Sequence, residues 1–326
     1  MVVNMDTNNF CISNTKRPCF LMSVPFFMSA DVINNKIMQE ILDALEPEER
    51  TINIDLALSQ FQELYNFISK NALVYLLPSY PDLQDQTYVA NLGIVLPHLS
   101  EPTVVISNYY SEVRRNESEV GREFFKLMKF PNVIDAPEYF EGEADLKYIR
   151  DNVYCGAYGL RTSKNALEWF EKSFDMKVIP ILMEDPYLYH LDCLLLPLSE
   201  DSVLACTKKL DRQTQTELEK YVNIYDLDEH IAFVAASNAL ILGNYILVGT
   251  NSKTLENKQH KYYQKECDKL SFLEKFCSKL NRELVLFDLS EFEKSGAALS
   301  CMVMHLNRNN YKTLPEQKNW IVSTIN

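Results

Sequence analysis

Glycine and basic residues are scarce in this chain of 326 residues. Eight glycines are spread over its whole length, and no linker, low-complexity tract or charge block divides it. There are 32 lysines and arginines against 45 aspartates and glutamates, a formal net charge of -13. Phosphate backbones are bound through clustered basic residues, so this balance argues against a nucleic-acid partner. We expect one acidic domain, and this acidity suits a small cationic ligand.

Disulfide frameworks, metal signatures and long apolar runs are also missing. The eight cysteines are irregularly spaced without a CxxC pair, and the five histidines do not pair with them at ligand spacings. No apolar stretch approaches the roughly 18 residues of a membrane-spanning helix. The N-terminus, MVVNMDTNNF, lacks the basic start and apolar core of a signal peptide. These absences predict a cytoplasmic protein with reduced thiols, no membrane contact, no metal and no cofactor.

Short strand-like runs dominate what is present. They are ALVYLLPSY, TYVANLGIVL, PTVVISNYY, VYCGAY, MKVIPILM, HLDCLLLPL, SVLACT, AFVAA, ALIL, YILVG, ELVLFDL and LSCMVMHL. Two antiparallel hairpins are expected, LLLPL with SVLACT and ALIL with YILVG, the second across Gly243-Asn244. Helix-like segments fall between the strands, as behind the serine cap at Ser163. Without the glycine-rich first turn of a nucleotide-binding sheet, this order favours repeated ββα modules.

Histidine and cysteine in strand-like segments are the candidates for chemistry. His190 lies in YHLDCLLL, and His305 follows Cys301 near the C-terminus. On a strand, His190 and Asp192 would face one side and Cys193 the other, in the core. Taken alone, however, a histidine in an apolar run is more often a satisfied core residue, and a buried cysteine acts as a small hydrophobe. The residues by themselves leave catalysis open.

Five motifs, taken in order, carry a resemblance that changes this balance. They are QDQTYVANLGIVL, YFEGEADLKY, GAYGLRTSKNALEWF, YHLDCLLLPL and SGAALSCMVMHL. From Leu21 to His305 the chain resembles the arginine deiminase, amidinotransferase and dimethylargininase superfamily. The resemblance implies an α/β pentein fold, a five-bladed propeller of ββαβ modules around a central channel. Residues 1–20 would form an N-terminal arm and residues 21–326 a single catalytic domain.

The resemblance also implies roles for residues in these motifs. The family's nucleophile falls on Cys301, its general acid and base on His190, and its guanidinium-binding carboxylates on Asp145 and Asp192. Glu141 would orient the histidine or bind substrate nitrogens, or else be a solvated loop carboxylate. Paired carboxylates suit a planar cation because they accept bidentate hydrogen bonds and offset the cost of burying it.

Three further residues have both a substrate-binding and a structural interpretation. Arg161 matches a motif arginine and would bind an α-carboxylate or form a salt bridge. Asn91 replaces a usual aspartate, as in relatives resembling arginine dihydrolases, which convert arginine to ornithine; it would bind substrate or only support a turn. Asn35 would touch substrate or cap the following helix.

Two departures from the family pattern bear on the site. Relatives have two glycines where this chain has Gly296-Ala297, so a positive φ at Ala297 would displace the loop before Cys301. Glu143 adds a charge where a small residue is common, which would alter substrate preference.

The function that the resemblance implies is cysteine-dependent hydrolysis of the guanidino group of arginine or a related compound. A covalent amidino-thioether intermediate would release ammonia and yield citrulline or ornithine. The alternatives are a dimethylarginine dimethylaminohydrolase, an amidinotransferase and an inactive guanidino-ligand binding protein. The sequence also leaves a homo-oligomer open.

Overall fold

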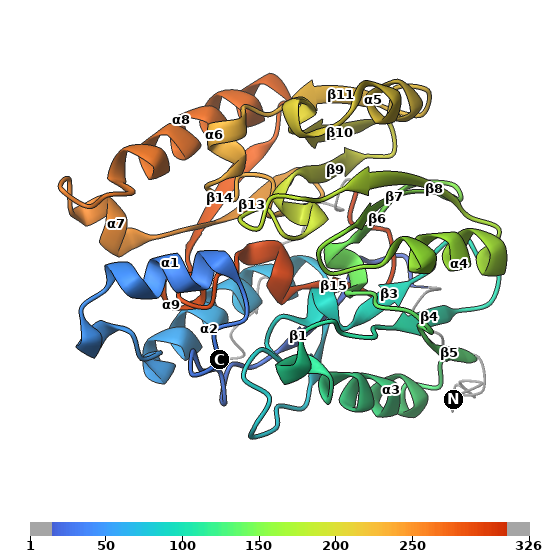
Figure 1. Ribbon diagram of the computed structural model, residues 1–326, viewed down its shortest axis with the longest axis horizontal. Helices are drawn as coiled ribbons and strands as arrows, with labels where there is room; N and C mark the ends of the chain where they lie inside the picture. Colours follow the sequence, from blue (N-terminus) through green and yellow to red (C-terminus); the bar gives the residue numbers. More distant parts are fainter. Residues whose placement is uncertain (1–14, 312–326) are drawn as a thin grey trace, which may run out of the picture.

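Five small three-stranded sheets, the blades, make up the computed structural model, which describes residues 15–311. In every blade the first strand is antiparallel to the middle strand, and the third is parallel to it (Figure 1). A parallel pair needs a long crossover, and helices supply it here. The expected pentein propeller of ββαβ modules is confirmed.

The blades are built from consecutive strands, with one exception. Blade 1 contains β15 (Met304–His305), β1 (Cys19–Ser23) and β2 (Leu73–Leu77); blade 2 contains β3 (Gly93–Val95), β4 (Thr103–Ile106) and β5 (Asn132–Asp135); blade 3 contains β6 (Leu146–Arg150), β7 (Val153–Tyr158) and β8 (Lys177–Leu182); blade 4 contains β9 (Leu195–Ser199), β10 (Ser202–Ala205) and β11 (Asn223–Asp226); blade 5 contains β12 (Ala239–Leu242), β13 (Tyr245–Thr250) and β14 (Glu283–Asp288). Both expected hairpins, β9–β10 and β12–β13, are present.

Blade 1 closes the ring because its first strand comes from the far end of the chain. Phe20 of β1 pairs with His305 of β15 in antiparallel register. Residues 1–14, most of the expected N-terminal arm, lie outside the described residues. Since β1 begins at Cys19, the last two residues of that arm already belong to the first sheet.

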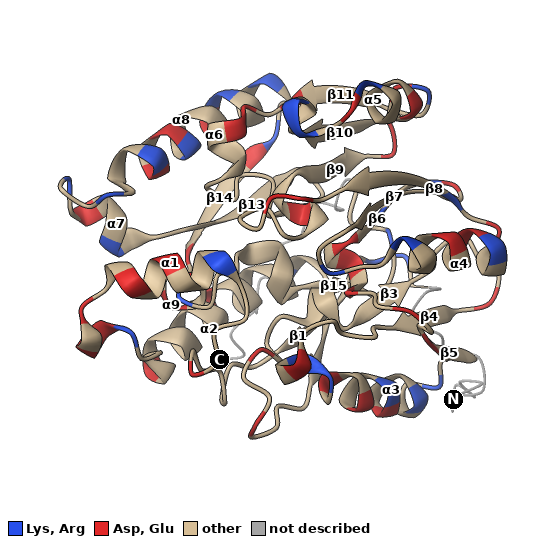
Figure 2. Cartoon of the chain, in the orientation of Figure 1, with Lys and Arg blue, Asp and Glu red and all other residues tan. Residues whose placement is uncertain are grey.

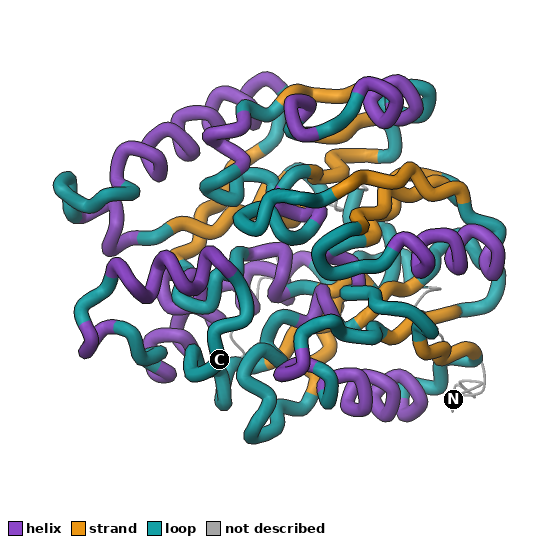
Figure 3. Tube along the Cα trace, viewed as in Figure 1, coloured by secondary structure: helices purple, strands orange, loops and turns teal. Residues whose placement is uncertain are grey.

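Helices pack around the strands (Figure 3). They are α1 (Lys36–Ala44), α2 (Ile54–Asn71), α3 (Glu117–Leu127), α4 (Lys164–Phe174), α5 (Arg212–Leu218), α6 (Glu229–Ala232), α7 (Ser252–Glu256), α8 (Tyr263–Lys279) and α9 (Ser290–Glu293). Several of the longer helices, such as α3, α4 and α8, lie at the outside of the molecule in Figure 3. The expected serine cap of α4 is confirmed, because Ser163 Oγ accepts a hydrogen bond from Ala166 N at 3.1 Å. Charged residues of both signs line α3, α4 and α8, whereas most strand residues are uncharged (Figure 2).

Short 3-10 turns come immediately before the first strands of four blades. They are η4 (Val89–Asn91), η6 (Gly142–Ala144), η7 (Leu191–Cys193) and η9 (Leu299–Met302). The expectation of continuous strands in TYVANLGIVL, HLDCLLLPL and LSCMVMHL was therefore wrong for their first halves, and AFVAA was wrong throughout, since it leads out of α6 into a turn. Buried apolar runs have the same composition in a turn as in a strand.

Between residues 15 and 311, no helix is both long and apolar enough to cross a membrane. Every cysteine in that range is a free thiol.

Candidate active site

The turns that precede the first strands bring polar side chains together at the centre of the propeller. Glu141, Asp192, Asn91, His190 and Cys301 come from four blades, and each is at most 6% exposed. Because charged and polar groups are costly to bury, each needs a hydrogen-bond or ion-pair partner, either another residue of the cluster or a bound ligand. The predicted catalytic residues thus share one buried cluster.

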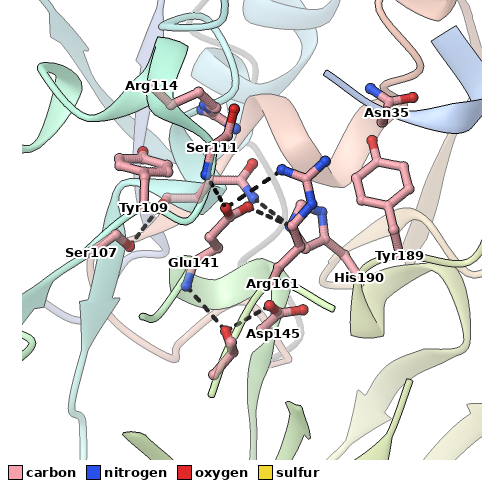
Figure 4. Close-up of polar contacts among 12 residues, drawn as sticks. Asn35, Ser107, Tyr109, Ser111, Arg114, Glu141, Asp145, Arg161, Tyr189 and His190 are labelled. Atoms are coloured by element: carbon pink, nitrogen blue, oxygen red, sulfur yellow. Dashed lines mark hydrogen bonds and ion pairs between the residues drawn. The ribbon is translucent and has the colours of Figure 1, made fainter. Parts of the chain in front are cut away.

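Glu141 holds His190 in place (Figure 4). Its Oε2 lies 2.8 Å from His190 Nε2, and Asn91 Nδ2 approaches the same ring nitrogen at 3.4 Å. Arg161 Nη1 lies 3.6 Å from the other carboxylate oxygen. Burial opposes ionisation of Glu141, but the hydrogen bond and charge of His190 and the charge of Arg161 outweigh it and lower its pKa to about 2. Glu141 is therefore a buried carboxylate, and not a solvated one.

Arg161 connects this cluster to the segment before α1. It donates to the carbonyl of Asn34 at 2.6 Å, and its guanidinium lies 5.2 Å from the centre of the Tyr189 ring. The Tyr189 hydroxyl in turn donates to the carbonyl of Gly296 at 2.9 Å. The arginine and its partners thus link four chain segments around the site.

Cys301 lies among polar side chains of two other blades. Asn238 Nδ2 donates to its Sγ at 3.4 Å, and the thiol lies 3.7 Å from Asp192 Oδ2. The same Asp192 oxygen accepts from Ser300 Oγ at 2.9 Å. Burial, reinforced by the charge of Asp192, raises the pKa of Cys301 to about 12. In this state the sulfur is a thiol, and a cation placed beside it would favour the reactive thiolate.

Asp145 lies behind the cluster. Its Oδ2 accepts from Thr162 Oγ1 at 2.7 Å and its Oδ1 from Leu191 N at 3.3 Å. Thr162 Oγ1 also accepts from Glu141 N at 3.2 Å, so the carboxylate braces η6 against η7. Burial raises the pKa of Asp145 to about 6. Asp145 lines neither of the two cavities described below, whereas Asp192 lines one of them.

Asn35 and the loop before Cys301 fit closely together. Asn35 caps α1, since its Oδ1 accepts from Met38 N at 2.7 Å, and its Nδ2 donates to Ser295 O at 3.0 Å. Gly296 has φ +72°, and a Cβ there would lie 2.3 Å from Asn35 Oδ1. Ala297 is not among the residues with positive φ. The loop therefore tolerates alanine at that position, and Gly296 supplies the unusual conformation.

Glu143 does not face the site. Its Oε1 accepts from Arg308 at 2.7 Å, and its Oε2 lies 2.8 Å from His305 Nδ1. These contacts join η6 to the end of β15. Burial and the charge of Arg308 lower the pKa of His305 to about 4. The contacts of Glu143 are therefore structural, and the structure does not support the expected effect of this residue on substrate preference.

Sequence reasoning missed two residues of the cluster, Asn238 and Asp85. Asn238 directly precedes β12, so its place in blade 5 corresponds to that of Asn91 in blade 2, and a comparison of the modules would have found it. Asp85 stands six positions before Asn91, in the motif QDQTYVANLGIVL. It is buried and accepts from Asn34 Nδ2 at 2.5 Å, and burial raises its pKa.

Two cavities meet at the thiol. The polar lobe, of about 20 Å³, is lined by charged and amide side chains that include Asp85, Glu141 and Arg161. The far lobe, of about 240 Å³, extends from Asp192 towards α1, α7 and α8. Four residues line both lobes and form a neck between them: Tyr189, His190, Ala297 and Cys301. A group that reacts with the thiol at the neck can therefore extend in either direction.

The described residues contain no group of three or more histidine, cysteine, aspartate or glutamate side chains that could hold a metal ion. The residues of the cluster contact one another through the hydrogen bonds and ion pairs described above.

The chain is similar in sequence to known proteins over most of its length. The chain is 25% identical over 295 residues to the bifunctional arginine dihydrolase/ornithine cyclodeaminase ArgZ of Synechocystis. The matched region covers 88% of this chain but only 37% of ArgZ. It is 21% identical over 261 residues to the N(G),N(G)-dimethylarginine dimethylaminohydrolase of Mycobacterium tuberculosis, 78% of each chain.

Solved structures match over nearly the whole fold. The product-bound N-terminal domain of ArgZ, a cyanobacterial arginine dihydrolase, superposes with a TM-score of 0.74 at 23% identity, covering 92% of this chain and all of that domain. The dimethylargininase of Pseudomonas aeruginosa, solved with citrulline, superposes with a TM-score of 0.63 at 15% identity, covering 88% of this chain and 98% of that one. Residues 26–308 match the family model described as eukaryotic N,N dimethylarginine dimethylhydrolase, so the chain belongs to this family of guanidino-modifying enzymes.

Proposed function

We propose that the chain is a cysteine-dependent hydrolase of the guanidino group of arginine or a closely related compound. The observation that carries the proposal is the neck between the two lobes, where Cys301 and His190 line the same space. One residue supplies a sulfur nucleophile and the other a proton carrier, and covalent hydrolysis of an amidine needs both. It needs no metal or cofactor.

The guanidinium binds beside the thiol, with Asp192 on the far-lobe side and Asn91 on the side of the polar lobe. Asp192 lies 3.7 Å from the sulfur, and its negative charge helps to keep the thiol protonated. A bound guanidinium neutralises that charge and adds its own, so substrate binding lowers the pKa of Cys301; the thiol proton passes to His190 and the thiolate forms. In this mechanism the nucleophile forms only when the substrate is present.

Asp145 was expected to bind the guanidinium as a second carboxylate. Its two hydrogen bonds and its place behind the cluster favour another role, in which it holds Thr162 and the backbone of η7. We propose that Glu141 provides the second negative charge at the site, because its Oε2 contacts the catalytic histidine and its Oε1 lies near Arg161.

His190 moves the protons. After Cys301 attacks the guanidinium carbon, His190 donates a proton to the departing nitrogen, and ammonia leaves. The neutral ring then accepts a proton from water, which attacks the amidino-thioether and releases a ureido product such as citrulline. Glu141, as a buried carboxylate with a strongly lowered pKa, stabilises the imidazolium in both steps.

The polar lobe suits the amino-acid end of the substrate. It combines Asp85, an acid, with the guanidinium of Arg161, so both charges of a zwitterion find a partner. Asn35 lines the same lobe while capping α1. At about 20 Å³ the lobe is too small for this group as it stands, and we expect the segment before α1, held by the bond from Arg161 to Asn34, to move when substrate enters.

Two products compete. Asn91 can both donate to and accept from a neutral ureido group, which favours a second hydrolysis to ornithine, ammonia and carbon dioxide. ArgZ, with 25% identity, is an arginine dihydrolase, which supports this outcome. The family model is named for dimethylarginine, which supports methylamine or dimethylamine release from a methylated substrate as the second candidate. Nothing in the cluster favours amidino transfer specifically.

Mass spectrometry of the products tests the proposal. Wild type and Cys301→Ser are incubated separately with arginine, dimethylarginine, agmatine and citrulline. Citrulline indicates deimination, ornithine dihydrolysis, dimethylamine a dimethylargininase, and a new guanidino compound amidino transfer to an added amine. Cys193→Ser, which changes the neighbouring thiol, is the matched control and should keep turnover.

Turnover by a folded Cys301→Ser variant would refute the nucleophile. Tight arginine binding by wild type with no product over a long incubation would favour the inactive binding protein instead. Circular dichroism and thermal melting of each variant separate loss of chemistry from loss of fold.

A further inference from the structure

The far lobe is larger than release of ammonia requires. Its volume is about 240 Å³, against the roughly 30 Å³ that one water occupies in the liquid. It begins at the neck beside Asp192 and Cys301, so it lies directly next to the reacting carbon. A cavity of this size beside a nucleophile has room for a substituent carried by the substrate.

The geometry of a guanidinium directs such a substituent into the far lobe. The three nitrogens lie in one plane and point away from the carbon in three directions. If the nitrogen that carries the amino-acid chain points into the polar lobe, the other two point towards His190 and towards Asp192. Asp192 lines the far lobe and not the polar lobe, so a group on a terminal nitrogen extends along the far lobe.

The walls of the far lobe combine apolar side chains with acids and lysines, and one of the acids, Glu293, has no ion-pair partner among the residues that the structure describes. Phe233, Val234 and Leu289 supply apolar surface. Glu293 accepts a hydrogen bond from Asn251 Nδ2 at 2.7 Å, and among residues 15–311 no lysine, arginine or histidine forms an ion pair with it.

Of the other acids that line this lobe, Glu49 is exposed, Asp192 lies beside the thiol, and the remaining two have a cation. Glu266 pairs with Lys269 at 2.7 Å, and Glu40 lies 3.5 Å from Lys261. Burial raises the pKa of Glu293 to about 7, although the charge of Lys269, which is paired with Glu266, acts in the opposite direction. An ammonium group in the lobe would therefore gain an unpaired partner at Glu293.

We propose, resting on the function proposed above, that the chain accepts N-substituted guanidines whose terminal nitrogen carries an unbranched alkyl chain ending in a primary ammonium. The amino-acid end occupies the polar lobe, the alkyl chain lies along Phe233, Val234 and Leu289, and the ammonium binds Glu293.

The reaction is the same hydrolysis with a larger leaving group. The sulfur–carbon bond forms as the bond between the carbon and the substituted nitrogen breaks, and that nitrogen takes a proton from His190. Water then replaces the sulfur. One substituted guanidinium and one water give one ureido compound and one alkylammonium ion, so atoms and charge balance.

The test compares kcat/KM for arginine, Nω-butylarginine and Nω-(4-aminobutyl)arginine, with the released amine identified by mass spectrometry. We expect wild type to prefer the aminobutyl to the butyl compound by about tenfold or more, because a hydrogen bond to a charged group contributes that much. Glu293→Gln should reduce this ratio to about one. Glu40→Gln, which removes an acid that already has its cation, is the matched control and should keep the ratio.

A second variant tests the cavity itself. Val234→Trp fills part of the far lobe and should lower kcat/KM for butylarginine at least about tenfold relative to arginine. If both substrates lose activity equally, the far lobe is the common entry route and the inference is overturned. If this variant does not fold, the ratio measured with Glu293→Gln still decides the matter.

Failure of this inference differs from failure of the proposed function. Wild type that hydrolyses arginine but neither alkylated compound retains the function and loses the inference. An unchanged preference in Glu293→Gln also overturns it. Wild type that hydrolyses none of the three compounds overturns both.

Discussion

Replacing Glu141 by glutamine removes one charge from the centre of the site with little change of shape. The carboxylate lies 2.8 Å from His190 Nε2 and 3.6 Å from Arg161 Nη1, and it is fully buried. Glutamine retains a hydrogen-bonding group but leaves the arginine and any imidazolium without a negative partner. We expect both turnover and stability to fall.

The structure sets the size and pH dependence of the stability change. The pKa of Glu141 falls from 4.5 to about 2 on folding, and a shift of that size corresponds to roughly 3 kcal/mol. Because the folded pKa is the lower one, this stabilisation is complete above pH 4.5 and is lost as the pH falls towards 2. Wild type should lose roughly 1 kcal/mol of it by pH 4, whereas Glu141→Gln loses none from this position.

Urea unfolding followed by circular dichroism at pH 7 and pH 4 measures this difference. Glu141→Gln should be about 3 kcal/mol less stable than wild type at pH 7 and less affected at pH 4, and kcat should fall at least about 100-fold. Glu119→Gln, in an exposed pair with Arg122, is the control and should change stability by less than about 1 kcal/mol. Equal destabilisation at both pH values, or kcat within about threefold of wild type, would refute the reasoning.

Three further changes test other contacts of the site. Asn238→Ala removes the donor that lies 3.4 Å from the Cys301 sulfur, so the pKa of Cys301 should rise and its alkylation by iodoacetamide at pH 8 should slow. An unchanged alkylation rate would contradict a role of Asn238 in stabilising the thiolate. Gly296→Ala places a Cβ 2.3 Å from Asn35 Oδ1 at φ +72° and should cost about 1–3 kcal/mol in urea unfolding, so an unaltered midpoint would count against the loop geometry. Arg308→Met leaves Glu143 buried without its arginine and should cost about 3 kcal/mol at pH 7, and less near pH 4; a constant cost would show that charge is not the cause.

Much of the site was predictable because its residues fall in recognisable motifs. Cys301, His190, Glu141 and Asn91 were named from sequence, and in the structure all four line the polar lobe. Asn238 was missed because it stands alone before a short strand, where no local pattern distinguishes it from a turn residue.

The orientation of each carboxylate was beyond local reasoning. Asp145 and Asp192 both precede the first strand of a blade. Asp192 faces the cavity, whereas Asp145 accepts hydrogen bonds from Thr162 and the backbone of η7. The strand parity used for His190 and Asp192 was wrong, because η7 is a 3-10 turn. Their proximity comes from the tight turn instead.

The sequence by itself determined the module type, both hairpins, the cap of α4 and the family, because each depends on residues close together along the chain or on motifs in a preserved order. Only the tertiary structure decided how β15 closes blade 1 with β1, which polar groups face the neck, and that Glu293 lies without a cation in a second lobe. These features depend on contacts between segments that lie tens to hundreds of residues apart along the chain. A burial pattern shows that a side chain is inside without showing which neighbours it meets.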